Sequence, residues 1–226
     1  MIPGARLIVL GKQGAGKGTQ CVRLSRHYVI PHIATGDMLR AAVKKRTRLG
    51  EEARRYMDAG ELVPDEVLLQ MVSDRLDQDD TKERGFVLDG FPRTVHQAEA
   101  LDLILEPAGV DLVVNLVVST QIVLRRLASR RVCMDCGANY SVSAPPRIGW
   151  ICDVCGGEVV QREDDTEGAI KRRLDLYEKQ TAPLVARYRR LGKLAAVRGD
   201  GPADAVTERL VKAVDERRVP RAGGWP

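Results

Sequence analysis

The sequence contains no long hydrophobic run and only three histidines. No apolar stretch approaches the roughly 20 residues that a membrane-spanning helix needs, so we expect no membrane segment. The short apolar stretch near the N-terminus ends at Lys12 and Gln13 without the cleavage pattern of a signal peptide, which favours a cytoplasmic protein. His27, His32 and His96 lie outside the motifs described below, and we expect surface or helix-end positions for them rather than a catalytic role.

The charge balance is only moderately basic. Lys and Arg number 36 against 31 Asp and Glu, which gives a formal net charge of +5 in a chain of 226 residues. This surplus suits anionic ligands, but it does not require nucleic acid, because the arginines do not form one continuous tract. The length allows one domain with insertions or two small domains.

The cysteines are few, and four of the five form two close pairs, Cys133 with Cys136 and Cys152 with Cys155. Each pair has the C-x-x-C spacing and is followed by a glycine, Gly137 or Gly156, that lets the backbone turn back toward the sulfurs. Four thiolates so spaced predict a structural Zn²⁺ site with no open position. Iron, two disulfides, free thiols or a nucleic-acid-binding zinc ribbon are the alternatives. Cys21 is interpreted as a small buried apolar residue.

Strand-like apolar runs alternate with segments of helical spacing, which predicts an α/β fold with a parallel sheet. The expected strands cover residues 7–10, 85–88, 112–118 and 194–197. The expected helices cover residues 19–28, 37–45, 49–59, 65–76, 120–131, 167–191 and 203–218. Residues 133–161 lose the helical spacing and are rich in Gly, Pro and Cys, so we expect a small inserted domain there.

A glycine-rich stretch follows the first expected strand directly. Residues 11–19 read Gly-Lys-Gln-Gly-Ala-Gly-Lys-Gly-Thr. Glycines leave backbone N–H groups accessible to a polyphosphate, the following helix N-terminus adds partial positive charge, and Lys17 adds a full one. The pattern predicts a P-loop that binds a nucleoside triphosphate. Gly18 stands where most P-loops have Ser or Thr, and the hydroxyl group moves to Thr19.

A second phosphate-handling cluster follows the expected strand at 85–88. Asp89 lies at the strand end, and Gly90 and Pro92 form a tight loop that directs Arg93 toward the P-loop. An Asp in this position can hold Mg²⁺, usually through its water shell.

Three motifs in this order resemble those of the adenylate kinase family. They are the P-loop at 14–20, the segment Ala-Thr-Gly-Asp-Met-Leu-Arg at 34–40, and Asp-Gly-Phe-Pro-Arg-Thr at 89–94. The resemblance runs from about Leu7 to Leu210. It implies a P-loop NTPase-type three-layer fold, reversible transfer of a phosphoryl group from Mg-ATP to AMP giving two ADP, and a monomer.

The resemblance also implies a division of the chain. The core would comprise residues 1–33, 64–129 and 167–217, with an inserted helical NMP-binding segment at 34–63 and a zinc-bearing lid at 130–166. We expect residues 218–226 to form a disordered tail.

The same resemblance assigns roles to individual residues. The implied ATP contacts are Gly14, Ala15, Gly16, Lys17, Gly18, Thr19, Arg126, Arg130, Asn139, Tyr140 and Gly201. The implied AMP contacts are Thr35, Arg40, Glu61, Leu62, Val63, Gly90, Phe91, Pro92, Arg93, Gln97, Arg162 and Arg173. Thr35 and Gln97 favour adenine over other bases.

Phosphoryl transfer needs alignment and charge neutralisation more than covalent work by the protein. Lys17 and the guanidinium groups of Arg93, Arg126, Arg162 and Arg173 are therefore the expected catalytic groups, without a general base. Arg130 and Arg162 flank the insert at its roots, so closure of the insert would bring both toward the P-loop and exclude water. Asp164 and Asp165 are interpreted as hinge and ion-pair residues. Arginines outside a motif could instead be solvated helix faces.

One position departs from the family pattern. Gln13 replaces the usual proline, which adds an N–H donor and loosens the loop, and we expect altered affinity at most. Two alternative functions stay open at this point. One is a related nucleoside monophosphate kinase with another base preference, and the other is a zinc-ribbon nucleic-acid-binding ATPase. Arg147 is the only Lys or Arg between Cys133 and Cys155, and this scarcity argues against the ATPase.

Overall fold

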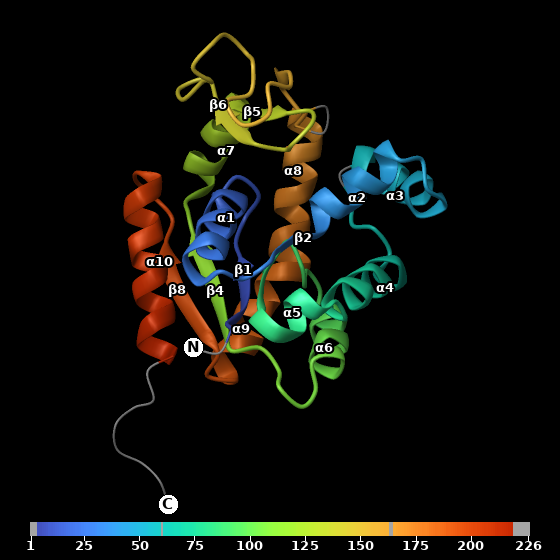
Figure 1. Cartoon of the computed structure of the whole chain (residues 1–226), viewed down its shortest axis with the longest axis vertical. Coiled ribbons are helices and arrows are strands. Elements are labelled where there is room, and N and C mark those ends of the chain that lie inside the picture. The colour runs from blue at the N-terminus through green and yellow to red at the C-terminus, as the bar shows by residue number, and fades with distance from the viewer. Residues whose placement is uncertain (1–3, 60, 163–164, 219–226) are drawn as a thin grey trace, which may run out of the picture.

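A computed structural model describes residues 4–59, 61–162 and 165–218 (Figure 1). Its centre is a five-stranded parallel sheet in the order β2-β3-β1-β4-β8. The strands are β1 (Arg6–Leu10), β2 (His32–Ala34), β3 (Phe86–Asp89), β4 (Leu112–Val117) and β8 (Leu194–Arg198). Parallel strands buried on both faces carry continuous apolar runs, and this explains why Leu7 to Leu10 and Phe86 to Leu88 are all buried.

Helices cover both faces of this sheet. The helices of the described residues are α1 (Lys17–Tyr28), α2 (Thr35–Lys44), α3 (Arg48–Ala59), α4 (Asp65–Leu76), α5 (Asp79–Arg84), α6 (Val95–Ile104), α7 (Thr120–Ser129), α8 (Glu167–Leu176), the π-helical turn η1 (Tyr177–Thr181), α9 (Ala182–Arg190) and α10 (Ala203–Arg218).

Alternate side chains of β1 enter the two cores. Leu7 and Val9 pack in the core that includes residues of α1 and α10, whereas Ile8 and Leu10 pack in the core that includes residues of α4, α6 and α9. The predicted three-layer α/β fold with a parallel sheet is confirmed.

Two segments project from the core. Helices α2 and α3 form one of them, on the right of Figure 1. The other is a three-stranded antiparallel sheet in the order β6-β5-β7, above α7 and α8 in the same view. Its strands are β5 (Arg130–Cys133), β6 (Asn139–Ser141) and β7 (Val159–Val160).

Several local expectations differ from the structure. Strand β2 was not expected, because three residues are too few to give a readable pattern, and neither were α5 and α6. Helix α7 ends at Ser129 rather than continuing to Arg131, because Arg130 is extended and pairs with Ser141 of β6. Arg126 and Arg130 therefore do not share a helix face, as they would if the expected helix over residues 120–131 were continuous.

None of the helices in the described ranges is both long and apolar enough to cross a membrane. The predicted tail at 218–226 lies outside the described residues except for Arg218, the last residue of α10.

Candidate active site

The P-loop connects β1 to α1 through three glycines with positive φ. These angles are 147° at Gly11, 78° at Gly14 and 100° at Gly16. A side chain would be strained at such angles, and a Cβ atom on Gly11 or Gly14 would lie 2.9 Å from the Leu116 carbonyl oxygen or 2.8 Å from Leu127 Cγ. The glycines therefore allow the loop to pack closely on the core while its backbone faces the site.

Lys17 begins α1 and folds back over this loop. Its Nζ donates hydrogen bonds to the carbonyl oxygens of Gly11, at 2.8 Å, and Lys12, at 3.0 Å. Burial lowers the pKa of the Lys17 amine, and the charges of Arg93 and Arg130 act in the same direction, although Asp89 opposes them. The ammonium group thus lies in an enclosed, electropositive place.

Asp89 ends β3 beside the P-loop strand, and its Cα is the register partner of Val9 in β1. Burial raises the pKa of the Asp89 carboxyl, but His32, Lys17 and Arg93 together outweigh it and hold the pKa below the ordinary value. A Cβ atom on Gly18 would lie 3.3 Å from Asp89 Oδ2, so the glycine in this unusual position leaves room for the carboxylate.

His32 corrects a sequence interpretation. It was expected at the surface or at a helix end, but it lies on β2 with its side chain 18% exposed. Its Nε2 is 3.7 Å from Asp89 Oδ2. Neither the apolar pattern nor a motif marked this position, because contact between β2 and β3 exists only in the folded sheet.

Arg93, in the third motif at residues 89–94, also lies near this site. Its Nε donates to the Gly90 carbonyl oxygen at 2.8 Å. Burial lowers the pKa of the Arg93 guanidinium, and the charges of Arg173, Arg40 and Arg162 lower it further, against the attraction of Asp89. Arg173, Arg40 and Arg162, which are distant from Arg93 in the sequence, therefore lie within electrostatic range of its guanidinium.

Arg130, at the first root of the insert, pairs with buried Asp165 at the other root. Arg130 Nε donates to Asp165 Oδ2 at 2.7 Å, and its Nη2 donates to Oδ1. Arg173 Nη1 lies 4.0 Å from the same Oδ1. The ion-pair interpretation of Asp165 is confirmed, whereas Asp164 lies outside the described residues.

Arg126 of α7 connects two loops through hydrogen bonds. It donates to the carbonyl oxygens of Ala15, in the P-loop, and Gly199, after β8, both at 3.0 Å. Gly201 follows with a φ of 94°. The predicted roles of Arg126 and Gly201 toward ATP stay predictions.

The implied AMP contacts surround the third motif. Thr35 Oγ1 donates to the Gly90 carbonyl oxygen at 3.1 Å, and Arg40 pairs with Asp37. Val63, Phe91 and Pro92 are buried, Leu62 is half-buried and Glu61 is exposed. This arrangement does not test the role of each of these residues in binding AMP, and those roles stay predictions.

Gln97 is fully buried and its amide is held at both ends. Its Oε1 accepts from the Arg93 backbone N–H at 2.7 Å, and its Nε2 donates to Asp65 Oδ1 at 2.5 Å. Asp65 Oδ2 also accepts from Thr94 Oγ1 at 3.2 Å. In the sequence Asp65 is only the first residue of an expected helix, yet it fixes the orientation of Gln97.

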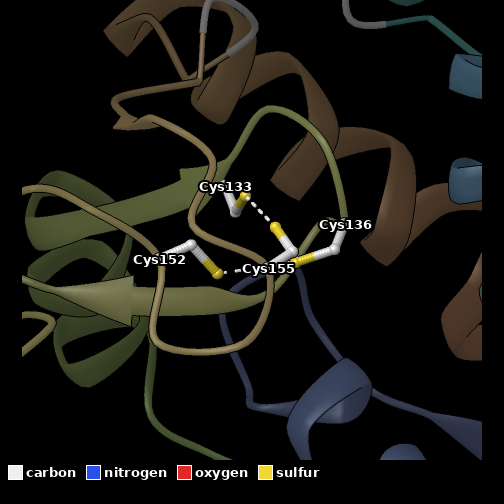
Figure 2. A group of neighbouring side chains, drawn as sticks. All are labelled: Cys133, Cys136, Cys152 and Cys155. Carbon is white, nitrogen blue, oxygen red and sulfur yellow. Dashed lines mark hydrogen bonds between the residues drawn. The ribbon is translucent and has the colours of Figure 1, made fainter.

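The four paired cysteines converge at one end of the small sheet (Figure 2). Sγ of Cys133 lies 3.4 Å from Sγ of Cys155, Sγ of Cys136 lies 3.5 Å from Sγ of Cys152, and all four sulfur atoms lie within 4.8 Å of one another. The group could hold a metal ion. The described cysteines are all free thiols, so the disulfide alternative is not seen.

Tyr140 supports this cluster. Its hydroxyl group hydrogen-bonds Sγ of Cys152 at 3.4 Å, which lowers the pKa of that thiol to about 6, and it accepts from the Asp153 backbone N–H at 2.8 Å. The family resemblance implied that Tyr140 contacts ATP. No signal in the sequence indicated that Tyr140 also hydrogen-bonds a cysteine of the cluster.

The projecting segments approach the core and each other. A Cβ atom on Gly18 would lie 4.0 Å from Asn139 Nδ2, so β6 lies over the P-loop. Lys44 Nζ of α2 lies 3.5 Å from Asp135 Oδ1 of the small sheet, and Arg172 Nε of α8 donates to the Ala59 carbonyl oxygen at 2.6 Å. The two projecting segments thus contact each other, and each approaches the core.

A phosphate loop at the carboxyl edge of a parallel sheet, with an acidic residue on the adjacent strand and converging arginines, defines a P-loop nucleotide-binding protein of the α/β class. The family model described as Adenylate kinase matches residues 9–193. An adenylate kinase of Caldicellulosiruptor bescii is 50% identical over 212 residues, covering 92% of this chain and 98% of the relative. Relatives of the same name in Clostridium kluyveri and Clostridium perfringens are 47% and 49% identical, over 92% of this chain and 97% of each relative. The chain belongs to the adenylate kinase family.

Proposed function

We propose that this protein transfers the terminal phosphoryl group of Mg-ATP reversibly to AMP, giving two ADP. The observation that carries the proposal is the concentration of positive charge at one place. Burial and the charges of Arg93 and Arg130 lower the pKa of Lys17, and burial and the charges of Arg173, Arg40 and Arg162 lower the pKa of Arg93. Such a concentration of positive charge favours anionic ligands. Two nucleotides meeting through their phosphates would place their negative charge beside it.

In this reaction the protein positions and neutralises rather than forming covalent bonds. The P-loop N–H groups and Lys17 would hold the ATP phosphates, and Arg93 would hold the AMP phosphate. Arg126, Arg162 and Arg173 would stabilise charge on the transferred group. Thr35 and Gln97 would select adenine, with Gln97 fixed in place by Asp65.

Asp89 would hold Mg²⁺ through water, and its lowered pKa keeps the carboxylate ionised for that purpose. Magnesium supplies charge neutralisation on the ATP phosphates when bound.

The four thiols would hold a structural Zn²⁺. Tetrahedral zinc with Zn–S bonds of about 2.3 Å places sulfurs about 3.8 Å apart, and the observed separations of 3.4 and 3.5 Å are close to this. With four protein ligands the metal has no open position and would fix the fold of the small sheet.

The division into core, NMP-binding segment at 34–63 and lid at 130–166 is part of the proposal. The lid would close on the bound nucleotides as a rigid unit, excluding water and suppressing hydrolysis of ATP. A protein of this organisation would act as a monomer.

The test measures ADP formation from ATP and AMP by wild type, Lys17→Met and the exposed control Lys45→Met. We expect Lys17→Met to lose at least about a hundredfold in rate and Lys45→Met to match wild type. Parallel assays with UMP, CMP and GMP should show a preference for AMP. A bisubstrate analogue with two adenosines joined by five phosphates should bind tightly, and undiminished activity of Lys17→Met or indifference to the analogue would contradict the proposal.

A further inference from the structure

Three side chains that could ligate a metal meet beneath the P-loop, away from the four-cysteine cluster. Cys21 comes from α1, His32 from β2 and Asp89 from the end of β3. One ligand atom from each, namely the thiol sulfur, an imidazole nitrogen and a carboxylate oxygen, lies within 4.8 Å of the other two. No motif of the sequence predicted this grouping, because the three residues are far apart along the chain.

The His32 imidazole is incompletely satisfied in this place. Its Nε2 is buried and has no hydrogen-bond partner among the described residues. The carboxylate of Asp89 approaches it, but the 3.7 Å between Nε2 and Oδ2 is too long for a hydrogen bond. A buried ring nitrogen without a partner is costly, and a cation between it and the carboxylate would remove that cost.

The spacing suits a first-row divalent ion. Bonds of about 2.0–2.3 Å in tetrahedral geometry place ligand atoms roughly 3.3–3.8 Å apart, and the 3.7 Å between His32 Nε2 and Asp89 Oδ2 already falls in this range. A thiolate and an imidazole favour Zn²⁺ or Co²⁺ over Mg²⁺ or Ca²⁺, which prefer oxygen ligands. Cys21 is fully buried, but the side chains of His32 and Asp89 are 18% and 15% exposed, which leaves a route of entry.

We propose that Cys21, His32 and Asp89 form a second metal site, which takes a divalent transition ion such as Zn²⁺ or Co²⁺ through sulfur, nitrogen and oxygen and leaves a fourth position open. On binding, the Cys21 thiol releases its proton to solvent, so that thiolate and carboxylate together balance the charge of the ion. The ammonium group of Lys17, one helical turn before Cys21, opposes binding. That group donates hydrogen bonds to the carbonyl oxygens of Gly11 and Lys12.

Occupation of this site inhibits phosphoryl transfer, and this consequence rests on the proposed function of Asp89. The carboxylate oxygen that ligates a transition ion is no longer an acceptor for the water shell of Mg²⁺, and the charge of the bound ion repels Mg²⁺. The second site is therefore an inhibitory one, and raising the Mg²⁺ concentration should relieve the inhibition.

Binding is tested without nucleotide, so that its outcome is independent of activity. Full-length protein with one equivalent of Zn²⁺ is titrated with Co²⁺, and the near-ultraviolet sulfur-to-cobalt band is recorded together with the amount of metal bound. The variants are Cys21→Ser and Cys21→Ala, with His32→Gln compared to the exposed His27→Gln on α1. Only Cys21 differs between wild type and the two Cys21 variants, so a difference in their thiolate bands reports on Cys21. The four other cysteines contribute equally to these samples, whatever metal they hold.

We expect wild type and His27→Gln to bind one additional Co²⁺ with a thiolate band. Both Cys21 variants should lose that band, and His32→Gln should bind at least about tenfold more weakly. In Mg-ATP assays, Cys21→Ser should keep the basal rate and escape inhibition by added Zn²⁺. A thiolate band or an inhibition that is the same in wild type and in both Cys21 variants, or no additional Co²⁺ in wild type, would overturn the proposal. Circular dichroism of both Cys21 variants verifies that they are folded.

Discussion

Gln13 of the P-loop donates a hydrogen bond from Nε2 to Oδ1 of Asp165, at 3.2 Å, and so joins the phosphate loop to the far root of the small sheet. Asp165 is the same carboxylate that pairs with Arg130 at the near root. The family's usual proline at this position could not make the contact, since it has no side-chain donor. Gln13, which departs from the family pattern, thus connects the phosphate loop to the proposed lid.

Replacing Gln13 by Ala should change stability only slightly. The variant loses one hydrogen bond, which contributes about 1 kcal/mol or somewhat more for a charged acceptor, but it also removes Oε1, which is buried without a partner. We expect a loss of about 1 kcal/mol or less in urea unfolding and a change of a few-fold in the KM for ATP. Gln70→Ala, which breaks an exposed bond to Asp74, is the control. A loss of several kcal/mol in Gln13→Ala would contradict the modest role.

Asp165→Asn should destabilise the protein much more. The Asp165 side chain is 0% exposed, and its loss of charge leaves Arg130 without its buried partner. Breaking a buried pair from one side costs about 3–5 kcal/mol, and a reduction of this order is expected in the free energy of unfolding. The matched control is Asp135→Asn, because Asp135 pairs with Lys44 but is 62% exposed, and it should be indistinguishable from wild type. Equal effects of the two variants would disprove the assignment.

Removal of the proposed zinc should disturb the small sheet first. The hydrophobic cluster of this segment is small, comprising the buried residues Cys133, Cys152 and Val159, so we expect its fold to depend on the metal. We expect a chelator or Cys136→Ser to lower the melting temperature in calorimetry, with loss of activity following. Cys21→Ser should retain this chelator-sensitive transition. A melting temperature that is unaffected by chelation would exclude a structural metal.

The Arg75–Asp80 pair should make stability depend on pH. Two hydrogen bonds of 2.8 Å from Arg75 lower the pKa of the Asp80 carboxyl. Because the folded pKa lies below the unfolded value of about 3.9, the carboxylate stabilises the fold above the unfolded pKa, and this contribution is lost as pH falls through the folded pKa.

Asp80→Asn should therefore be less stable than wild type at pH 7, by about 1 kcal/mol or less since the pair is partly exposed. The difference should vanish when the pH is below the folded pKa. Urea unfolding across this pH range measures it, with the exposed Glu83→Gln of the same helix as control. A difference that persists at low pH would show that the ion pair is not its cause.

Arg93→Met should separate function from stability. We expect kcat to fall by about 10²–10³, because the proposed charged donor that holds the AMP phosphate in line for transfer is lost. The nucleotide-free protein should be equally or more stable, since burial and the charges of Arg173, Arg40 and Arg162 disfavour the Arg93 charge. Thermal unfolding without nucleotide tests this against exposed Arg189→Met. A marked drop in melting temperature would indicate that Arg93 mainly holds the fold.

Local patterns predicted much of this molecule because their physical cause is local. The apolar runs of β1, β3, β4 and β8 are continuous because both faces of the sheet are buried, and their bounds were predicted within one or two residues. Helix α4 was predicted with its observed bounds, residues 65–76. Strand β2 was missed because its conformation depends on pairing with β3.

The sequence by itself determined the glycine-rich loop, the two cysteine pairs and the order of the three motifs, since glycine conformation, ligand spacing and hydrophobic periodicity act over a few residues. Only the tertiary structure decided which distant residues bind the same carboxylate or lie close enough together to hold one ion. Three such contacts join segments that are distant in the chain. They are the cluster of Cys21, His32 and Asp89, the hydrogen bond from Gln97 to Asp65, and the hydrogen bond from Gln13 to Asp165. Such contacts depend on strand order and register, which a single sequence does not express locally.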